Sequence, residues 1–145
     1  MKMLILRGVA GRYEGRDWPR GALHEEFALE YAKQRGYEGQ VLDISGEAYE
    51  GSPQARLALA TYRRDPTITA LYGFSGGGYN LYHVIHGMNK HEKARLRLVV
   101  VLGAPKTSAR AYKGPWELVY RVDPPGGHMD GPRALLNELR GAANE

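Results

Sequence analysis

A serine set between closely spaced glycines is the best candidate in this chain for covalent chemistry. Residues 73–77 read Gly-Phe-Ser-Gly-Gly, the pattern G-x-S-x-G, at the end of an apolar run and the start of a helical pattern. A sharp turn from strand to helix would lift the Ser75 hydroxyl above the edge of a sheet. The pattern predicts a nucleophilic serine, although a glycine-rich turn of this kind could instead bind a phosphate at residues 75–78.

A base and an acid that could activate this serine follow it in the chain. A serine hydroxyl is a weak nucleophile near neutral pH and needs a base, which an acid orients in turn. Asp123 ends an apolar run, and His128 comes five residues later, after two glycines and shortly before Pro132. Five extended residues span at most about 18 Å, so this segment can fold back on itself. Asp130 is an alternative acid, although a charge near the start of a helix would also explain it.

The elements that must position these residues alternate between short apolar runs and helical patterns. The apolar runs predict buried strands at residues 3–6, 40–44, 68–74, 98–102 and 117–122. Helical periodicity is present between the first four runs and again after Pro132, whereas residues 103–115 lack it and are expected to form a loop near the active site. This alternation predicts one α/β domain over residues 1–145, a three-layer α/β/α sandwich whose mostly parallel, five-stranded sheet has the order 2-1-3-4-5. In that order Ser75 and Asp123 lie at one sheet edge, two strands or about 10 Å apart.

The order serine, aspartate, histidine on such a framework resembles the α/β-hydrolase superfamily. The resemblance covers the order of elements along most of the chain and, as motif, residues 68–90 and 116–136. It implies a compact serine hydrolase without a cap domain, which cleaves an ester, a thioester or a related acyl bond through an acyl-enzyme on Ser75. Asp123 and His128 would complete the triad. The chain departs from the family pattern because no strand and helix separate the acid from the histidine.

Backbone N–H groups near Ser75 are the candidates for stabilising an oxyanion. The N–H of Gly76 follows the serine at the start of the predicted helix. The resemblance implies a second donor in the loop after the first strand, where Gly8 and Val9 are the candidates. A plain glycine turn explains that loop equally well.

Four further side chains are candidates for binding a substrate. Phe74 precedes the serine, and Arg12, Tyr13 and Trp18 belong to an arginine-rich and glycine-rich loop after the first strand. Such side chains can recognise an acidic or sugar-like substrate by hydrogen bonds and stacking. Solvated arginines are the simpler explanation for that loop.

The composition excludes several other classes of function. The chain has 145 residues and no cysteine, so disulfides, thiolate metal sites and cysteine nucleophiles are excluded. Its 20 basic and 16 acidic residues give a net charge of +4 and are interspersed, which is atypical of a nucleic-acid binder. No apolar run is long enough for a membrane span or a secretory signal. We therefore expect a cytoplasmic protein with a small acyl substrate and no metal or other cofactor; the oligomeric state stays open. The alternative is a flavodoxin-like or degenerate hydrolase module that binds an anion without catalysis.

Overall fold

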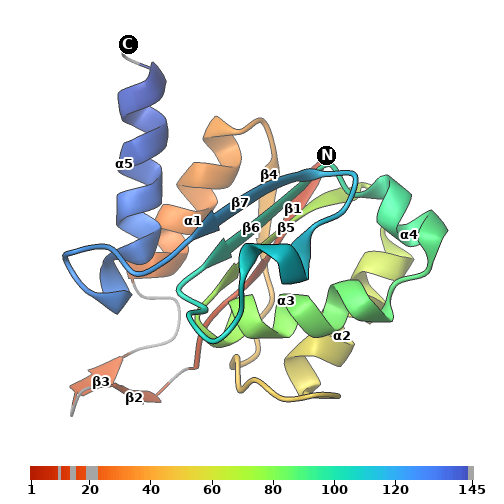
Figure 1. The fold of residues 1–145 in the computed structure, drawn as a ribbon, viewed down its shortest axis with the longest axis horizontal. Coiled ribbons are helices and arrows are strands. Elements are labelled where there is room, and N and C mark those ends of the chain that lie inside the picture. The colour runs from red at the N-terminus through yellow and green to blue at the C-terminus, as the bar shows by residue number, and fades with distance from the viewer. Residues whose placement is uncertain (10, 14–15, 19–22, 144–145) are drawn as a thin grey trace.

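A five-stranded sheet forms the middle layer of the protein in the computed structural model, which describes residues 1–9, 11–13, 16–18 and 23–143. The strands are β1 (Lys2–Leu6), β4 (Glu38–Val41), β5 (Ile68–Phe74), β6 (Leu98–Leu102) and β7 (Glu117–Arg121). Their order across the sheet is β4-β1-β5-β6-β7, which confirms the predicted order (Figure 1). Every neighbouring pair is parallel, so the sheet is entirely parallel.

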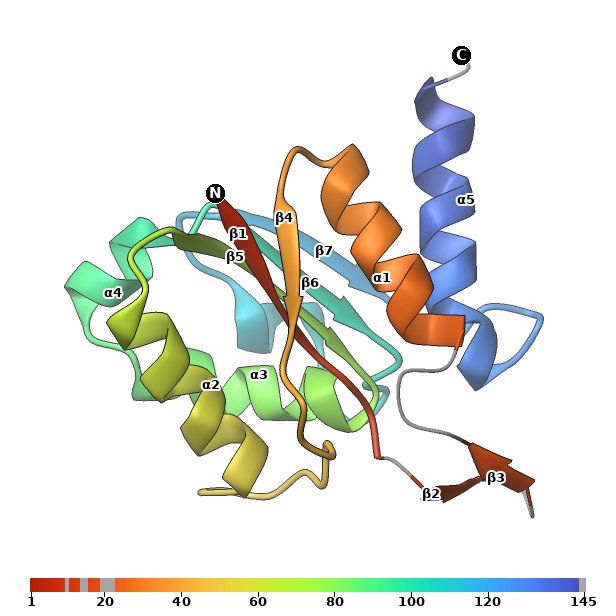
Figure 2. The same cartoon turned by 180° about the vertical axis from the view of Figure 1, so that it is seen from behind.

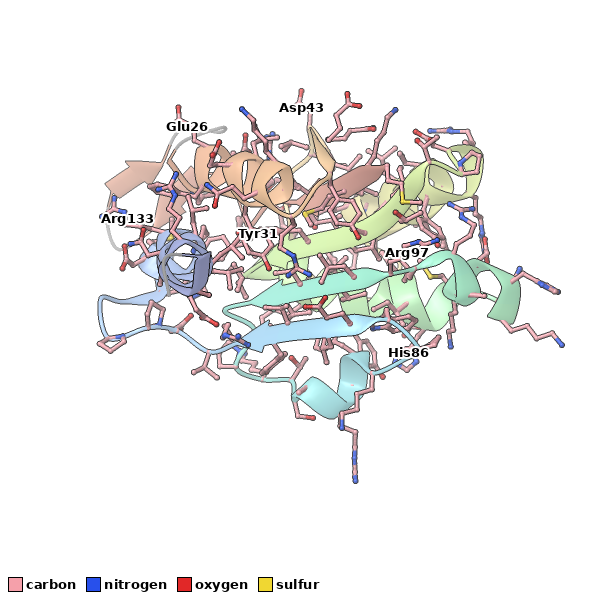
Figure 3. All side chains as sticks on the ribbon, turned by 90° about the horizontal axis from the view of Figure 1, so that it is seen from above. Glu26, Tyr31, Asp43, His86, Arg97 and Arg133 are labelled. Atoms are coloured by element: carbon pink, nitrogen blue, oxygen red, sulfur yellow. The ribbon has the colours of Figure 1, made fainter. Side chains whose placement is uncertain are left out.

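Helices cover both faces of this sheet and confirm the three-layer arrangement (Figures 1 and 2). Helices α1 (Leu23–Gln34) and α5 (Gly131–Ala143) lie side by side on one face. Helices α2 (Pro53–Arg64) and α3 (Gly76–Gly87) pack together on the other face, and the short α4 (Lys90–Arg95) follows α3. On α1, Tyr31 points toward the sheet while Glu26 points away from it (Figure 3).

Two apolar cores result, one on each face of the sheet. Because successive strand residues point to opposite faces, Leu4 and Leu6 of β1 belong to the core under α2 and α3, and Met3 and Ile5 to the core under α1 and α5. All seven residues of β5 are buried. Burial on both faces explains why these strands read as continuous apolar runs rather than as alternating ones.

The predicted elements differ from the observed ones mainly at their ends. Strand β4 ends at Val41, although the N–H of Leu42 still donates a hydrogen bond to the carbonyl of Ile5. The 3₁₀ helices η1 (Ala109–Tyr112) and η2 (His128–Asp130) occupy segments that the sequence marks as loops. Two short antiparallel strands, β2 (Gly11–Tyr13) and β3 (Arg16–Trp18), lie beyond the carboxyl end of β1 (Figure 2).

The helices of the described residues are all short. None of the helices within these ranges has both the length and the apolar character that crossing a membrane requires. The longest of them, α5, has 13 residues, whereas a membrane-spanning helix needs about 20.

Candidate active site

Ser75 is the single residue between the end of β5 and the start of α3. Its backbone angles are φ 56° and ψ −118°, and it is the only residue other than glycine with a positive φ in the described part of the chain. Its N–H donates to the carbonyl of Leu102 at 2.8 Å, and its own carbonyl accepts from the N–H of Tyr79 at 3.1 Å. A side chain on Gly73 would meet the carbonyl oxygen of Gly77 at 2.5 Å, so the motif glycines let strand and helix approach. The sequence thus folds into the sharp turn that the motif predicts.

The structure brings the Ser75 hydroxyl, the His128 imidazole and the Asp123 carboxylate together in one line. His128 Nε2 lies 2.8 Å from Ser75 Oγ, and His128 Nδ1 lies 2.7 Å from Asp123 Oδ1. When the carboxylate is ionised, the Nδ1–H donates to it, and Nε2 is then free to accept the hydrogen of the serine hydroxyl. Such an arrangement can withdraw the hydroxyl proton as the oxygen attacks.

A tight turn joins Asp123 to His128. Asp123 follows the end of β7 by two residues, and His128 begins η2. The N–H of Gly127 donates to the carbonyl of Pro124 at 2.9 Å, which folds the segment back. The alternative acid, Asp130, instead has its Oδ1 3.6 Å from Nη1 of Arg133 at the start of α5. The structure therefore places Asp123, and not Asp130, against the imidazole.

Gly103, directly after β6, allows the acid and the imidazole to approach, and the sequence reasoning missed it. A Cβ at this position would lie 2.8 Å from Cε1 of His128 and 3.0 Å from Oδ1 of Asp123. Its φ of +63° is also unfavourable for residues with a side chain. A glycine immediately after a buried strand, at the edge where the serine lies, is the signal that could have identified it.

The ring of Phe74, the last residue of β5, packs against the imidazole of His128. Phe74 is only 3% exposed, and its ring stacks on His128 with centroids 5.1 Å apart. The ring of His24 also lies against that of Phe74, with centroids 5.5 Å apart. Burial, with a smaller contribution from the charge of Arg7, lowers the pKa of His24 below its ordinary value. Phe74 thus contacts the imidazole, and its contact with a substrate stays a prediction; nothing in the sequence pointed to His24.

The loops proposed to hold the oxyanion do lie beside the serine. A Cβ on Gly8 would be 3.3 Å from Cβ of Ser75, and a Cβ on Gly76 would be 3.5 Å from Cγ2 of Val9. The carbonyl of Gly8 accepts a hydrogen bond of 3.1 Å from the N–H of Gly46. The backbone around residues 8, 46 and 76 therefore meets at the start of α3.

Three fully buried polar side chains tie these loops to α2 and α3. The Asn80 amide donates to Oε1 of Gln54 at 2.9 Å and to the carbonyl of Glu47 at 3.0 Å, and its Oδ1 accepts from the Ser52 hydroxyl at 2.9 Å. The Gln54 amide then donates to the carbonyl of Arg7 at 2.9 Å. Each of these bonds joins two members of the network or joins one member to a loop that borders Ser75. The network therefore fixes the position of these loops.

Arg7, which directly precedes the arginine-rich loop, is buried rather than solvated. Arg7 is only 7% exposed, with Nε 2.6 Å from Oε1 of Glu25 and Nη1 3.2 Å from Oδ1 of Asp43. A buried guanidinium with two carboxylate neighbours anchors the end of β1 to α1.

The other substrate-binding candidates of that loop are Arg12, Tyr13 and Trp18. Strands β2 and β3 contain Arg12, Tyr13 and Trp18. The side chains of these three residues lie outside the described residues. Their contact with a substrate stays a prediction.

A cleft of about 450 Å³ opens beside the serine. Its lining includes Val9, Ala48, Ser75, Tyr79, His83 and Lys106. This volume lies in the range of sites for small molecules, about 300–1,000 Å³. The cleft places a substrate-sized space next to the Ser75 hydroxyl.

Comparison with known proteins assigns no family to the chain. It matches no protein-family model, and no curated protein matches its sequence. The function must therefore be argued from the arrangement of Ser75, His128 and Asp123.

Proposed function

We propose that this protein is a serine hydrolase of the α/β-hydrolase type, which cleaves a small ester, thioester or related acyl bond. The observation that carries the proposal is the hydrogen-bonded line from Asp123 through His128 to Ser75, at 2.7 and 2.8 Å. Two distant segments of the chain supply these groups, and Ser75 is the only described residue other than glycine with a positive φ. We expect the enzyme to act in the cytoplasm, and the side chains themselves provide the nucleophile and the base.

A purely structural role for Ser75 has less support. Serine at the start of a helix commonly caps it by accepting a hydrogen bond from a backbone N–H. Ser52 does this for α2, whereas the Ser75 side chain makes no such bond to α3. The Ser75 hydroxyl instead meets the imidazole, which favours a chemical role.

The reaction proceeds in two balanced halves. Ser75 Oγ forms a bond to the carbonyl carbon while its proton moves to Nε2 of His128, and the carbonyl electron pair moves onto oxygen. The resulting intermediate expels the alcohol or thiol, which takes the proton from Nε2 and leaves an acyl-enzyme. Water then attacks the acyl carbon, gives one proton to Nε2, and releases the acid as that proton returns to Oγ. Asp123 stabilises the imidazolium at both stages.

Backbone N–H groups would stabilise the negative oxygen. Gly76 opens a helix of 12 residues, where the unpaired N–H groups and the helix dipole favour an anion. Gly8 or Val9, which lie beside Ser75 and Gly76, would supply the second donor. Removal of one such donor typically costs about 10²–10³ in rate.

The anion-binding alternative has weaker support. A phosphate held at residues 75–78 does not need an imidazole and would leave His128 away from the serine. The distance of 2.8 Å between Nε2 and Oγ favours the hydrolase.

Labelling with a fluorophosphonate probe tests the proposal. The wild-type protein should be labelled on Ser75, as located by mass spectrometry, and Ser75→Ala should remain unlabelled. Asp123→Asn should slow labelling and ester hydrolysis by up to about 10⁴-fold, because the imidazole loses its correct tautomer. Asp130→Asn is the matched control on the same loop and should react like the wild type. Labelling of Ser75→Ala at the wild-type rate would contradict the proposal.

A further inference from the structure

The cleft beside Ser75 follows the axis of α3 away from the nucleophile. Ser75, Tyr79 and His83 are spaced by four residues and all line the cleft. Residues four apart lie on one face of a helix and are separated by about 6 Å along its axis. The cleft therefore extends past Tyr79, about 6 Å from the serine, to His83, about 12 Å from it.

The position of His128 decides which part of a substrate enters this cleft. The leaving group must receive its proton from Nε2 and so departs on the side of the imidazole. His128 and Asp123 do not belong to the described lining of the cleft. The cleft is therefore on the acyl side of the scissile bond, and the acyl chain lies along α3.

Lys106 lines the same cleft from the loop after β6, which several hydrogen bonds hold in place. Its backbone N–H donates to the Tyr79 hydroxyl at 3.0 Å. The Thr107 hydroxyl donates to the carbonyl of Ala104 at 2.8 Å, and the Tyr120 hydroxyl donates to the carbonyl of Thr107 at 2.7 Å. The loop thus holds the backbone of Lys106 against the Tyr79 hydroxyl.

The charges around the cleft are one-sided. Lys106 and the imidazole of His83 line it, and no aspartate or glutamate does among the residues that the structure describes. Lys106 also has no carboxylate within ion-pair distance in the described ranges. An unpaired ammonium group on the rim of a mainly uncharged cleft is complementary to an anion at the far end of the acyl chain.

We propose that the acyl substrates carry a terminal carboxylate that binds Lys106, so that the protein prefers monoesters or monothioesters of dicarboxylic acids. This inference rests on the proposed hydrolase function. A chain extends about 1.2 Å per bond, as an extended backbone does, so the 6 Å to the level of Tyr79 corresponds to about five bonds. Five bonds separate the two carboxyl carbons of adipic acid.

Two p-nitrophenyl esters of equal length test the preference. The mono-p-nitrophenyl ester of adipic acid carries the free carboxylate, and p-nitrophenyl methyl adipate replaces it by a neutral methyl ester. The wild type should have the higher kcat/KM for the charged ester. Lys106→Met should lower kcat/KM for the charged ester by about three- to fivefold, the strength of one exposed ion pair, and leave the neutral ester unaffected. Lys106→Arg should retain the preference, and added salt should weaken it.

The controls separate failure of this inference from failure of the proposed function. Lys113→Met removes an exposed lysine outside the cleft and should change neither ester. Hydrolysis of both esters that depends on Ser75, with a charged-to-neutral ratio unchanged in Lys106→Met, overturns the inference alone. An equal drop in Lys113→Met also overturns it, because the effect would then come from the overall charge. Absence of Ser75-dependent hydrolysis of either ester overturns the function and the inference together.

Discussion

Replacing Ser75 by glycine should give a more stable protein than replacing it by alanine. At φ 56° and ψ −118° a residue with a Cβ is strained, and such conformations cost about 1–3 kcal/mol. Glycine relieves this strain but gives the unfolded chain extra freedom, worth about 0.4–1 kcal/mol in the opposite direction. Both variants lose the hydroxyl, so its bond to His128 cancels from the comparison. The difference should therefore be about 1 kcal/mol in favour of Ser75→Gly.

Urea unfolding followed by circular dichroism measures this difference. One difference in the free energy of unfolding is taken between Ser75→Gly and Ser75→Ala. The reference is the difference between Ala60→Gly and the wild type, which has alanine at position 60. Ala60 lies in α2 with ordinary helical neighbours, so there glycine should destabilise by about 1 kcal/mol. If Ser75→Gly is less stable than Ser75→Ala by a similar amount, the turn stores no strain and the reasoning is refuted.

Three further changes probe the supports of the site. Asn80→Leu removes the partners of a buried acceptor on Gln54 and of the buried Ser52 hydroxyl; at about 1–3 kcal/mol for each unsatisfied group, urea unfolding should show a loss of about 2 kcal/mol or more. Gly103→Ala pushes on the imidazole at 2.8 Å and should slow fluorophosphonate labelling at least about tenfold, since small misplacements of catalytic groups are costly. His24→Asn should flatten the fall in melting temperature between about pH 8 and about pH 5.

The sign of the last effect follows from the lowered pKa of His24. Burial penalises the charged imidazole in the folded protein, so the unfolded chain binds a proton first as the pH falls through the ordinary value of 6.5. The wild type therefore loses stability on acidification until the folded form is protonated too. Identical pH slopes for wild type and His24→Asn would contradict this account.

Asn80→Leu and Gly103→Ala each have a matched control on α5. Asn137→Leu alters an exposed asparagine and should leave stability nearly unchanged. Gly141→Ala meets no atom within 4 Å and should be neutral or slightly stabilising. A loss in Asn80→Leu no larger than in Asn137→Leu would show that the buried network contributes little. Labelling of Gly103→Ala at the wild-type rate would show that the imidazole adapts.

The sequence predicts the sheet and the line of candidate residues because both depend on local patterns. Strands buried on both faces read as short apolar runs, and the parallel order brings their carboxyl ends to one edge. Ser75 and Asp123 come at or directly after such ends, so their proximity follows from the predicted topology. The turn that returns His128 follows from the Pro-Pro-Gly-Gly segment.

The supporting residues could not be predicted because their roles depend on contacts between distant segments. Arg7 is paired with Glu25 of α1, and His24 comes to lie against Phe74 only once α1 is seated on the sheet. Asn80 and Gln54 read as ordinary polar helix residues until α2 and α3 pack together and bury both of them. A single sequence carries no periodicity that marks such long-range pairs.

The short turn between Asp123 and His128 joins these two residues so closely that any displacement of the loop should move both together. Both belong to a segment of six residues that follows the edge strand β7. The only neighbour of β7 in the sheet is β6. Fraying of that edge would carry the pair away from Ser75 as a unit, keeping the carboxylate on its imidazole while separating the imidazole from the hydroxyl. We therefore expect the site to depend on how firmly β7 is docked on β6, as well as on the hydrogen bond between Asp123 and His128.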